Sequence, residues 1–498
     1  MAKFKPYLFG QAELLPASLD EWIPTDDLVR TVSDIVEELD LSELIARYSE
    51  RGEEAYHPRM MVKILFYGVA TGVFSSRELQ RKIHFDICFR WLCGIGDKPD
   101  FRTISDFRKN NLDVLPKLFR DIVEIAGRLG YVSLRHVSID GSKIKANASK
   151  HKAMSRERMK QELARIEKEI GQALEAAQVE DESHNVTVPL FELQGAPTEN
   201  LIDRRDKIKA ALAELEERKP DDESEDCKKD QISFTDPDSR IMNTKNQGVI
   251  QAYNPQIAVD ADNGFIVGVS MSNSSSDQQQ FDAVLDSIQE NTGRMPQKVT
   301  ADAGYFSAAN IKSCQSRKVD GYIAASREGR QVGNSFDKQN FTYDPQEDVY
   351  VCPAGKMLTL KQTQHAKDPH KSTKWVYECQ ACPECPFQKE CARAKSGLRT
   401  ITRTEADPVR EAMRTKVQSE EGKAIYRQRK MIVEPVWGEV KQVQGFRQFN
   451  LRGKEKVHGE FLLVAIGHNL RKLHAMSHPK PDTRYRRERS AQKRGTAA

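Results

Sequence analysis

Three acidic residues, Asp140, Asp302 and Glu434, have sequence contexts that could bring their carboxylates together. Asp140 ends the apolar run HVSID, Asp302 ends KVTAD, and a turn containing glycine follows each of them. Adjacent strands would place these two carboxylates at one edge of a sheet, and Glu434 belongs to a predicted helix that can lie across that edge. Hard cations such as Mg²⁺ prefer carboxylate oxygens, and two such ions about 4 Å apart promote phosphoryl transfer. The three acids are therefore candidate catalytic and metal-binding residues.

A single acidic residue at the end of a strand is more often a turn or cap residue than a metal ligand. The surroundings of these acids favour the second role. Asp140 lies in SIDGSKIKANAS, where Lys143 and Lys145 could contact phosphate. Asp302 ends an apolar strand in which an unpaired carboxylate would be unfavourable.

The segment from residue 26 to residue 130 is predicted to be helical, because its apolar residues repeat at helical spacing. Ser75 and Thr103 are the expected N-caps of two of its helices. Short helices, tight turns and basic residues fit a helix-turn-helix-like DNA-binding region, and they fit a plain helical packing domain equally well. The basic residues are Arg77, Arg81, Lys82, Arg102, Arg108 and Lys109.

Apolar runs after residue 135 predict the strands of a sheet. HVSID is the first, and two runs on either side of Asp260-Ala261-Asp262-Asn263-Gly264 indicate a hairpin. A helix, the strand KVTAD, a second helix and the strand GYIAAS follow, which predicts a mixed sheet with helices packed on it. Asp260 and Asp262 are weaker candidates for metal ligands, because Asp-Asn-Gly is ordinary hairpin chemistry.

A charged segment after Lys150 carries apolar residues at helical spacing in two stretches separated by a polar break. The pattern predicts a helical hairpin, which we interpret as a solvated structural insertion. The apolar residues are Leu163, Ile166, Ile170, Leu174, Ile208, Leu212 and Leu215.

Five of the nine cysteines cluster in a segment, residues 327–405, that shows little periodicity. Cys-x-x-Cys steps favour metal over disulfide in a reducing compartment, so we expect a structural Zn²⁺ bound by four of the five, with unliganded thiols as the alternative. The cluster consists of Cys352, Cys379, Cys382, Cys385 and Cys391. The scattered cysteines are expected to be ordinary thiols: Cys88, Cys93, Cys227 and Cys314.

Three blocks of the sequence, taken in order, resemble the DDE transposases of bacterial insertion sequences, which have an RNase H-like catalytic core. The blocks are SIDGSKIKANAS, VTADAGYFS and VEPVWGEVKQVQGFRQFNLRGKEKVHGEFLLVAIGHNLRKL. The resemblance covers most of the chain. It implies that Asp140, Asp302 and Glu434 bind two Mg²⁺ or Mn²⁺ ions. It also implies cleavage of a phosphodiester at transposon ends and strand transfer into target DNA.

The third block is also similar to the tyrosine-arginine-glutamate-lysine signature of one subgroup. Lys441 follows Glu434 by seven residues, which is two helical turns, so both side chains should share a face where the lysine can hold phosphate. Glu439 is the rival acid and should point elsewhere. Basic residues downstream, among them Arg447, Arg452, Lys454 and Lys456, could bind the cleaved DNA end.

The first half of the signature fits less well. Tyr426 and Arg429 would supply it, but four residues separate Arg429 from Glu434 where the subgroup has three. Pro435 could allow a bulge that absorbs the extra residue, or Lys430 could replace the arginine.

The expected fold class is α/β: an RNase H-like mixed sheet flanked by helices, with an all-helical N-terminal domain and two insertions. The expected divisions are 1–135 (helical, DNA-binding), 136–149 (first core strand), 150–232 (helical hairpin), 233–326 (core), 327–405 (Cys-rich), 406–476 (core end with the Glu434 helix) and 477–498 (basic disordered tail).

Composition agrees with a soluble protein that has a modest core and does not enter a membrane. Net charge is +4, hydrophobic residues make up 38% and charged residues 30%. No apolar run approaches the length of a membrane span and the start has no apolar signal region, so a cytoplasmic location is expected. The expected partners are transposon terminal inverted repeats, target DNA and a second copy of the chain. A non-catalytic DNA-binding regulator and an RNase H-like nuclease without strand transfer are the alternatives.

Overall fold

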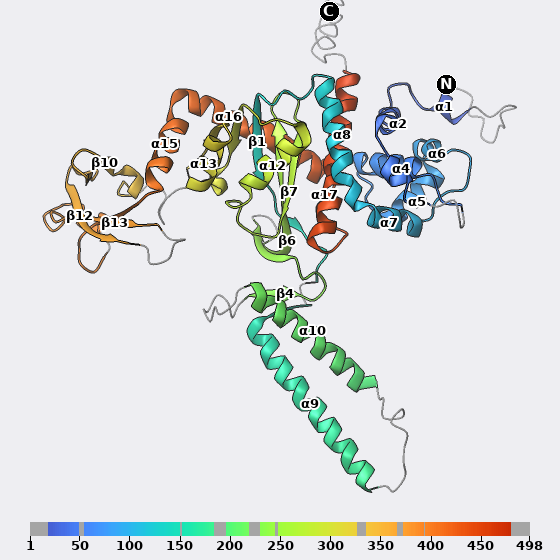
Figure 1. Cartoon of the computed structure of the whole chain (residues 1–498), viewed down its shortest axis with the longest axis horizontal. Coiled ribbons are helices and arrows are strands. Elements are labelled where there is room, and N and C mark those ends of the chain that lie inside the picture. The colour runs from blue at the N-terminus through green and yellow to red at the C-terminus, as the bar shows by residue number, and fades with distance from the viewer. Residues whose placement is uncertain are drawn as a thin grey trace, which may run out of the picture.

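The computed structural model describes residues 18–48, 54–149, 152–183, 196–218, 230–244, 248–325, 335–365, 372–392 and 394–479. These residues form a mixed α/β protein: a central sheet with helices on both sides, an N-terminal helical region and a second sheet (Figure 1). No helix in this part of the chain is long and apolar enough to cross a membrane. Cys227 and residues 480–498 of the predicted tail lie outside the described residues.

Five of the N-terminal helices, α1, α2, α4, α6 and α7, begin after a residue whose side chain accepts a free backbone N–H. Asp100 accepts the N–H of Thr103 at 2.8 Å, so the predicted cap at Thr103 is wrong and the helix starts at Phe101. Ser75 occupies the other predicted cap position, but its side chain makes no capping hydrogen bond. The helices are α1 Leu19–Trp22, α2 Leu28–Glu38, α3 Ser42–Ile45, α4 Pro58–Ala70, α5 Ser76–Phe85, α6 Ile87–Cys93, α7 Phe101–Asn110, η1 Leu112–Val114 and α8 Leu115–Arg128.

The helix α17, Lys454–Ser477, lies between the N-terminal helices and the central sheet (Figure 1). Its middle is buried on every side, as expected for a helix in the core of a protein. A Cβ at Gly467 would lie 3.0 Å from the backbone of Val69, so glycine permits the close approach of α4. One hydrophobic core therefore extends from the N-terminal helices through α17 into the sheet.

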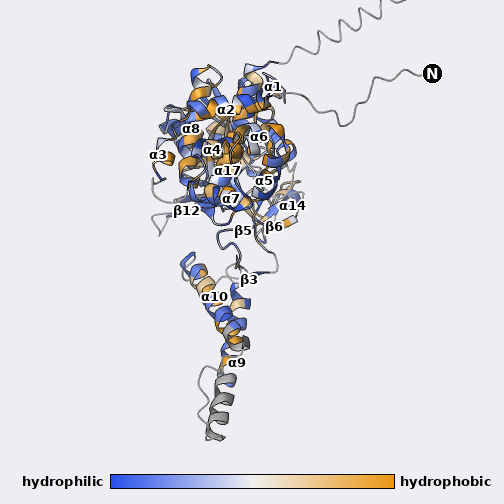
Figure 2. Cartoon of the chain, turned by 90° about the vertical axis from the view of Figure 1, so that its right-hand side faces the viewer, coloured by the Kyte–Doolittle hydropathy of each residue, from blue (hydrophilic) through white to orange (hydrophobic). Residues whose placement is uncertain are grey.

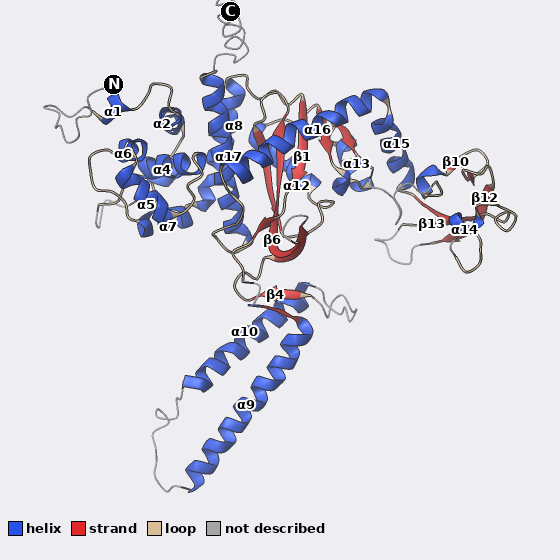
Figure 3. Cartoon of the chain, turned by 180° about the vertical axis from the view of Figure 1, so that it is seen from behind, coloured by secondary structure: helices blue, strands red, loops and turns tan. Residues whose placement is uncertain are grey.

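The central sheet has seven strands among the described residues, with β1 in its middle (Figure 3). β1 pairs antiparallel with β6 on one side and parallel with β8 on the other, and β9 continues the parallel part. β7 and β5 pair with β6 along its other edge. The strands are β1 His136–Gly141, β2 Ile144–Lys145, β5 Arg240–Thr244, β6 Gly248–Asp260, β7 Ile266–Ser272, β8 Lys298–Ala301 and β9 Asp320–Ile323.

Helices cover the two faces of this sheet. α12 packs on β7, while α16 crosses β1, β8 and β9 and continues directly into the π-helical turn η5. The bounds are α12 Phe281–Thr292, η3 Ala303–Tyr305, α13 Ala308–Ser316, α15 Asp407–Gln418, α16 Glu420–Gly438 and η5 Glu439–Val443.

Two long helices, α9 (Arg156–Ser183) and α10 (Ala196–Arg218), pack side by side and project away from the sheet (Figures 1 and 2). Their base is a small sheet of β3 (Ala153–Ser155) and β4 (Gln231–Ser233). A separate core joins the two helices, and the side chain of Leu174 lies outside the described residues. This core buries Met159, Ile166, Ile208, Ala211, Leu212, Leu215 and Ile232.

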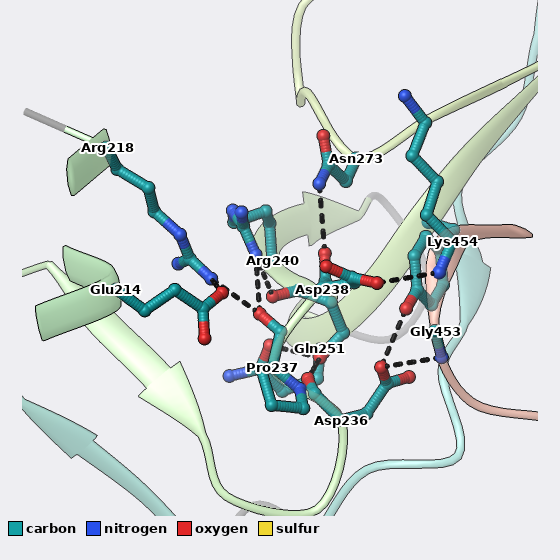
Figure 4. Close-up of polar contacts among 12 residues, drawn as sticks. Glu214, Arg218, Asp236, Pro237, Asp238, Arg240, Gln251, Asn273, Gly453 and Lys454 are labelled. Carbon is teal, nitrogen blue, oxygen red and sulfur yellow. Dashed lines mark hydrogen bonds and ion pairs between the residues drawn. The ribbon is translucent and has the colours of Figure 1, made fainter. Parts of the chain in front are cut away.

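The turn between β4 and β5 makes hydrogen bonds that connect this helical pair to the rest of the chain (Figure 4). Asp236 is fully buried and accepts hydrogen bonds from the Tyr253 hydroxyl at 2.7 Å and the Gly453 N–H at 3.1 Å. Arg218, at the end of α10, donates to the carbonyl oxygen of Pro237 at 2.8 Å. The base of the helical pair is thus bonded to β6 and to the segment that precedes α17.

The Cys-rich segment contains a five-stranded antiparallel sheet at the far end of the molecule from the N-terminal helices (Figures 1 and 3). The sequence predicted no strands in it, because several are only three residues long and the longest, β12, is mostly exposed. The elements are η4 Lys338–Asn340, β10 Thr342–Asp344, β11 Val349–Val351, β12 Met357–Gln364, β13 Lys374–Glu378, α14 Gln388–Cys391 and β14 Thr400–Thr404.

Candidate active site

Asp140 and Asp302 lie next to each other at the ends of two parallel strands. Ile139 of β1 pairs with Ala301 of β8; Asp140 is the next residue of β1, and Asp302 directly follows the last residue of β8. Adjacent strands are about 4.8 Å apart, so the two side chains leave the sheet at the same edge. The N–H of Gly304 donates to Asp302 at 2.8 Å, which fixes this carboxylate at the start of η3. Asp302 is thus both a cap residue and a neighbour of Asp140.

The carboxyl of Asp140 is held in an unusual electrostatic environment. Burial raises its pKa to about 6; the Arg429 guanidinium opposes this rise, and the carboxylates of Asp302 and Asp277 add to it. A bound cation would reduce the electrostatic repulsion among these three carboxylates. The site therefore has the donor chemistry for a divalent metal ion at its Asp140–Asp302 edge.

Arg429 and Tyr426 reach this edge from α16. Arg429 Nη1 lies 3.4 Å from Asp140 Oδ1, and the arginine side chain is 11% exposed. Its Nε is buried and has no hydrogen-bond partner within the described part of the chain, so it can still donate to a ligand. The guanidinium also lies 6.0 Å from the centre of the Tyr426 ring. Lys430, the alternative to Arg429, is exposed.

Lys441 enters the site from η5. Its ammonium hydrogen bonds to the Ser142 hydroxyl and lies 5.4 Å from the centre of the Trp437 ring. Burial lowers the pKa of Lys441, and the nearby Asp140 opposes that change. The π-helical turn η5, which includes Lys441, follows α16. α16 itself continues through Pro435 without a break. α16 therefore has no bulge between Arg429 and Glu434, and η5, which begins after Glu434, does not absorb the extra residue.

A cleft of about 540 Å³ adjoins Gly141 and collects several of the predicted phosphate-binding residues. Lys143, Lys441 and Arg447 line it, together with Asp277. Lys143 donates to the carbonyl oxygen of Asn243 at 3.1 Å. The cleft thus carries three cations, and its lining begins at Gly141, the residue after Asp140. Outside its lining, the Nε of the predicted DNA-binding residue Arg452 donates to a backbone carbonyl at 3.0 Å.

No interaction joins Glu434 to the two aspartates within the described residues. Its side chain is exposed and makes no hydrogen bond or ion pair within the described residues. Glu439 points to the other side, where it binds Arg471 at 2.8 Å and His468 at 3.3 Å. Burial alone would raise the pKa of Glu439, but the interactions with His468 and Arg471 lower it to about 2. Glu439 is therefore a structural residue.

No group of three or more His, Cys, Asp or Glu residues in the described ranges is arranged to hold a metal ion. Asp140 and Asp302 fit a hard cation by their chemistry and position, while Glu434 is not assembled with them. The convergence of all three acids thus stays a prediction.

Asp277 is a site residue that the sequence analysis missed. Its Oδ1 accepts hydrogen bonds from Asn254 at 2.6 Å and Gln256 at 2.9 Å, and a Cβ at Gly304 would lie 3.1 Å from its Oδ2. Within SNSSSDQQQ this aspartate has no distinguishing context. The sequence feature that could have indicated Asp277 is in β6. Asn254 and Gln256 interrupt this apolar strand, and buried amide side chains need hydrogen-bond partners.

Two family models match the chain. The "Transposase DDE domain" matches residues 351–474, and the "Transposase domain (DUF772)" matches residues 17–110. Together the two matches support a DDE transposase of insertion-sequence type. No curated protein sequence matches it.

The matched segments cover different parts of this transposase. The DDE match includes the cysteine cluster, Glu434 and Lys441, and the other match covers the N-terminal helices through α7. Asp140 and Asp302 lie in neither segment, so their role depends on the strand geometry described above.

The five clustered cysteines of this transposase meet around one small pocket in the second sheet. The N–H of Lys356 donates to Cys352 Sγ at 3.2 Å, and the N–H of Arg399 donates to Cys382 Sγ at 3.3 Å. Burial raises the pKa of the Cys379 thiol to about 11. The side chains converge, but no group of them among the described residues is arranged to hold a metal ion. The structural zinc site therefore stays a prediction.

Asp260 has a structural role in the transposase. It lies three residues along β6 from Ile257, the partner of Asp140, and is fully buried. Its carboxylate accepts the N–H groups of Leu134 at 2.8 Å and Asp262 at 3.1 Å, and Leu134 has a left-handed φ of 58°. The hydrogen bonds hold the turn that leads into β1.

Replacing Asp260 with alanine should destabilise the fold by about 2–3 kcal/mol, because the buried N–H of Leu134 loses its acceptor. Urea unfolding followed by circular dichroism measures the change. Asp262→Ala is the matched control: it removes one surface ion pair with Arg135, and about 1 kcal/mol or less should be lost. Equal losses in the two variants would contradict the role assigned to Asp260.

Proposed function

We propose that this transposase cleaves DNA at transposon ends and transfers the freed 3′ ends into target DNA. The observation that carries the proposal is that Asp140 and Asp302 directly follow Ile139 and Ala301, which pair across two parallel strands. A cleft with three cations begins at Gly141, the residue after Asp140. The central sheet would then be an RNase H-like catalytic core. Phosphodiesters are anionic, and both the cations and the carboxylates suit their binding and cleavage.

Asp140, Asp302 and Glu434 would hold two Mg²⁺ or Mn²⁺ ions. When bound, such ions activate a nucleophile and stabilise the leaving oxygen of a phosphodiester. Arg429 balances the charge of Asp140, and its unpartnered Nε can donate to a phosphate oxygen. Lys441 is positioned by Ser142 to contact the same strand.

Tyr426, Arg429, Glu434 and Lys441 together would form the tyrosine-arginine-glutamate-lysine signature. The contact of Arg429 with Asp140 favours this arginine over Lys430 as its second member.

The remaining DNA contacts are assigned to two regions. Lys143, Arg447 and Arg452 lie in or near the cleft and would hold the transposon end. The N-terminal helices would bind the terminal inverted repeat through a helix-turn-helix-like arrangement. Two transposon ends have to be brought together, so the active form would be a homodimer on DNA. A structural zinc ion would stabilise the Cys-rich sheet.

The proposal is tested with a duplex that ends in the inverted repeat flanking the gene. Wild-type protein should cut it in Mg²⁺ or Mn²⁺ and join the product to a second duplex, and a chelator should stop both reactions. Cutting that persists in the chelator would contradict the proposal. Cutting without joining would indicate the nuclease alternative, and binding without cutting would indicate the regulator.

A further inference from the structure

The loop between β7 and α12 brings the carboxylate of Asp277 to the candidate active site in a fixed orientation. Its Oδ1 accepts hydrogen bonds from Asn254 Nδ2 at 2.6 Å and from Gln256 Nε2 at 2.9 Å. A Cβ at Gly141, the residue paired with Gln256, would overlap this amide, so glycine at that position gives the amide room to reach Asp277. Because both amides bind the same oxygen, the other oxygen, Oδ2, is left without a hydrogen bond from the described residues.

Gly304 leaves a gap between this oxygen and the carboxylate of Asp302. A Cβ at Gly304 would lie 3.1 Å from Asp277 Oδ2 and 3.0 Å from Asp302 Oδ1. Two oxygens from different carboxylates therefore border one small space, which the absence of a side chain at position 304 keeps open. Gly304 is not among the glycines with positive φ, so its backbone conformation does not require glycine. The need for glycine at this position is therefore steric.

The two carboxylates that border the gap have no cation of their own. Neither Asp277 nor Asp302 forms an ion pair within the part of the chain that the structure describes, whereas Arg429 lies 3.4 Å from Asp140. Like charges that face the same space repel each other, and a bound cation removes that repulsion. A hard divalent cation is commonly bound by one or two carboxylates, with water and phosphate oxygens as its other ligands. Two carboxylates beside an open cleft fit this chemistry.

We propose that Asp277 binds the same divalent cation as Asp302, in the gap that Gly304 keeps open between the two carboxylates. Asn254 and Gln256 are then positioning residues, because they hold one oxygen of Asp277 and leave the other for the cation. This inference rests on the proposed function, since it takes Asp302 as a metal-binding residue of a phosphoryl-transfer site.

The test measures Mn²⁺ binding without DNA, by electron paramagnetic resonance, in which the signal of free Mn²⁺ disappears on binding. Asp277→Asn keeps the shape of the side chain and an oxygen for the two amides, but removes the charge. Gly304→Ala keeps both carboxylates and fills the gap with one methyl group. Each variant should weaken Mn²⁺ binding at least about tenfold.

A matched glycine variant and thermal melts separate cation binding from a folding defect. A Cβ at Gly438 of α16 would meet no atom within 4 Å, so Gly438→Ala should bind Mn²⁺ as wild type does. In a chelator, Asp277→Asn and Gly304→Ala should melt at the wild-type temperature. Added Mn²⁺ should raise the melting temperature of wild type more than that of either variant, because a ligand stabilises the state that binds it. Wild-type Mn²⁺ affinity in Asp277→Asn or in Gly304→Ala would overturn the proposal.

The outcomes also distinguish this cation site from the proposed function. Wild-type protein that cuts and joins DNA, while Asp277→Asn and Gly304→Ala keep its Mn²⁺ affinity, would remove only the role of Asp277. Wild-type protein that neither binds Mn²⁺ nor cuts the terminal repeat would remove both proposals.

Discussion

Replacing Asp302 with asparagine should lower the rate of metal-dependent DNA cleavage by a factor of about 10³ or more. The amide has nearly the shape of the carboxylate and can still accept the N–H of Gly304 through its oxygen, so the turn at η3 should persist. It lacks the negative charge and the second oxygen that a hard cation requires. Cleavage of the terminal-repeat duplex measures the effect, and Mn²⁺ binding followed by electron paramagnetic resonance gives a readout independent of activity.

Asp262→Asn is the matched control for this experiment. Asp262 lies in the turn that follows β6 and pairs with Arg135 on the surface, and Asp260 of the same hairpin lies away from Asp140. The control should cut DNA at the wild-type rate. A similar rate for wild type and Asp302→Asn would remove Asp302 from the mechanism.

Glu434→Gln should also reduce cleavage by about 10³-fold or more, without changing the stability of the protein. Glu434 is exposed and unpaired among the described residues, so replacing its carboxylate removes no contact that stabilises the fold. Asp277 is the competing carboxylate, because it lies beside Asp302 and Asp140. If Glu434→Gln remains active while Asp277→Asn does not, Asp277 takes the place assigned to Glu434.

Glu439→Gln, unlike Glu434→Gln, should lower the stability of the fold. It removes the charge that pairs with the buried His468 and with Arg471, and it should destabilise the fold by about 3 kcal/mol. The pKa of Glu439 is lowered from 4.5 to about 2, so its stabilising effect is complete above pH 4.5 and is lost as the pH falls toward 2. The variant should therefore lose less stability than wild type across that pH range in thermal melts.

The parts of the fold that follow from local pattern were predictable. HVSID and KVTAD are short apolar runs ending in aspartate, and they became β1 and β8. Their adjacency and parallel pairing bring Asp140 and Asp302 to one edge, which the sequence analysis expected of adjacent strands. The direction of Glu439 away from the site also followed from helical spacing.

Other features depend on tertiary contacts that no local pattern encodes. The wide turn at η5 is one, because nothing in GEVKQV distinguishes a π-helical turn from an α-helical one. Asp277 is another, since its place in the site is set by amide groups that lie more than twenty residues earlier in the chain. The second sheet was missed because its exposed strands lack the apolar alternation on which strand prediction depends.

The position of α17 determines when the N-terminal helices can finish folding during translation. Gly467 and its neighbours in α17 fill the space between α4 and the sheet, roughly 400 positions after Val69. The N-terminal helices, although they leave the ribosome first, cannot complete their packing until translation has passed Ser477. A nascent chain therefore exposes the apolar surface of α4 and α8 throughout its elongation, and a truncated product should be captured by chaperones or degraded instead of competing for DNA.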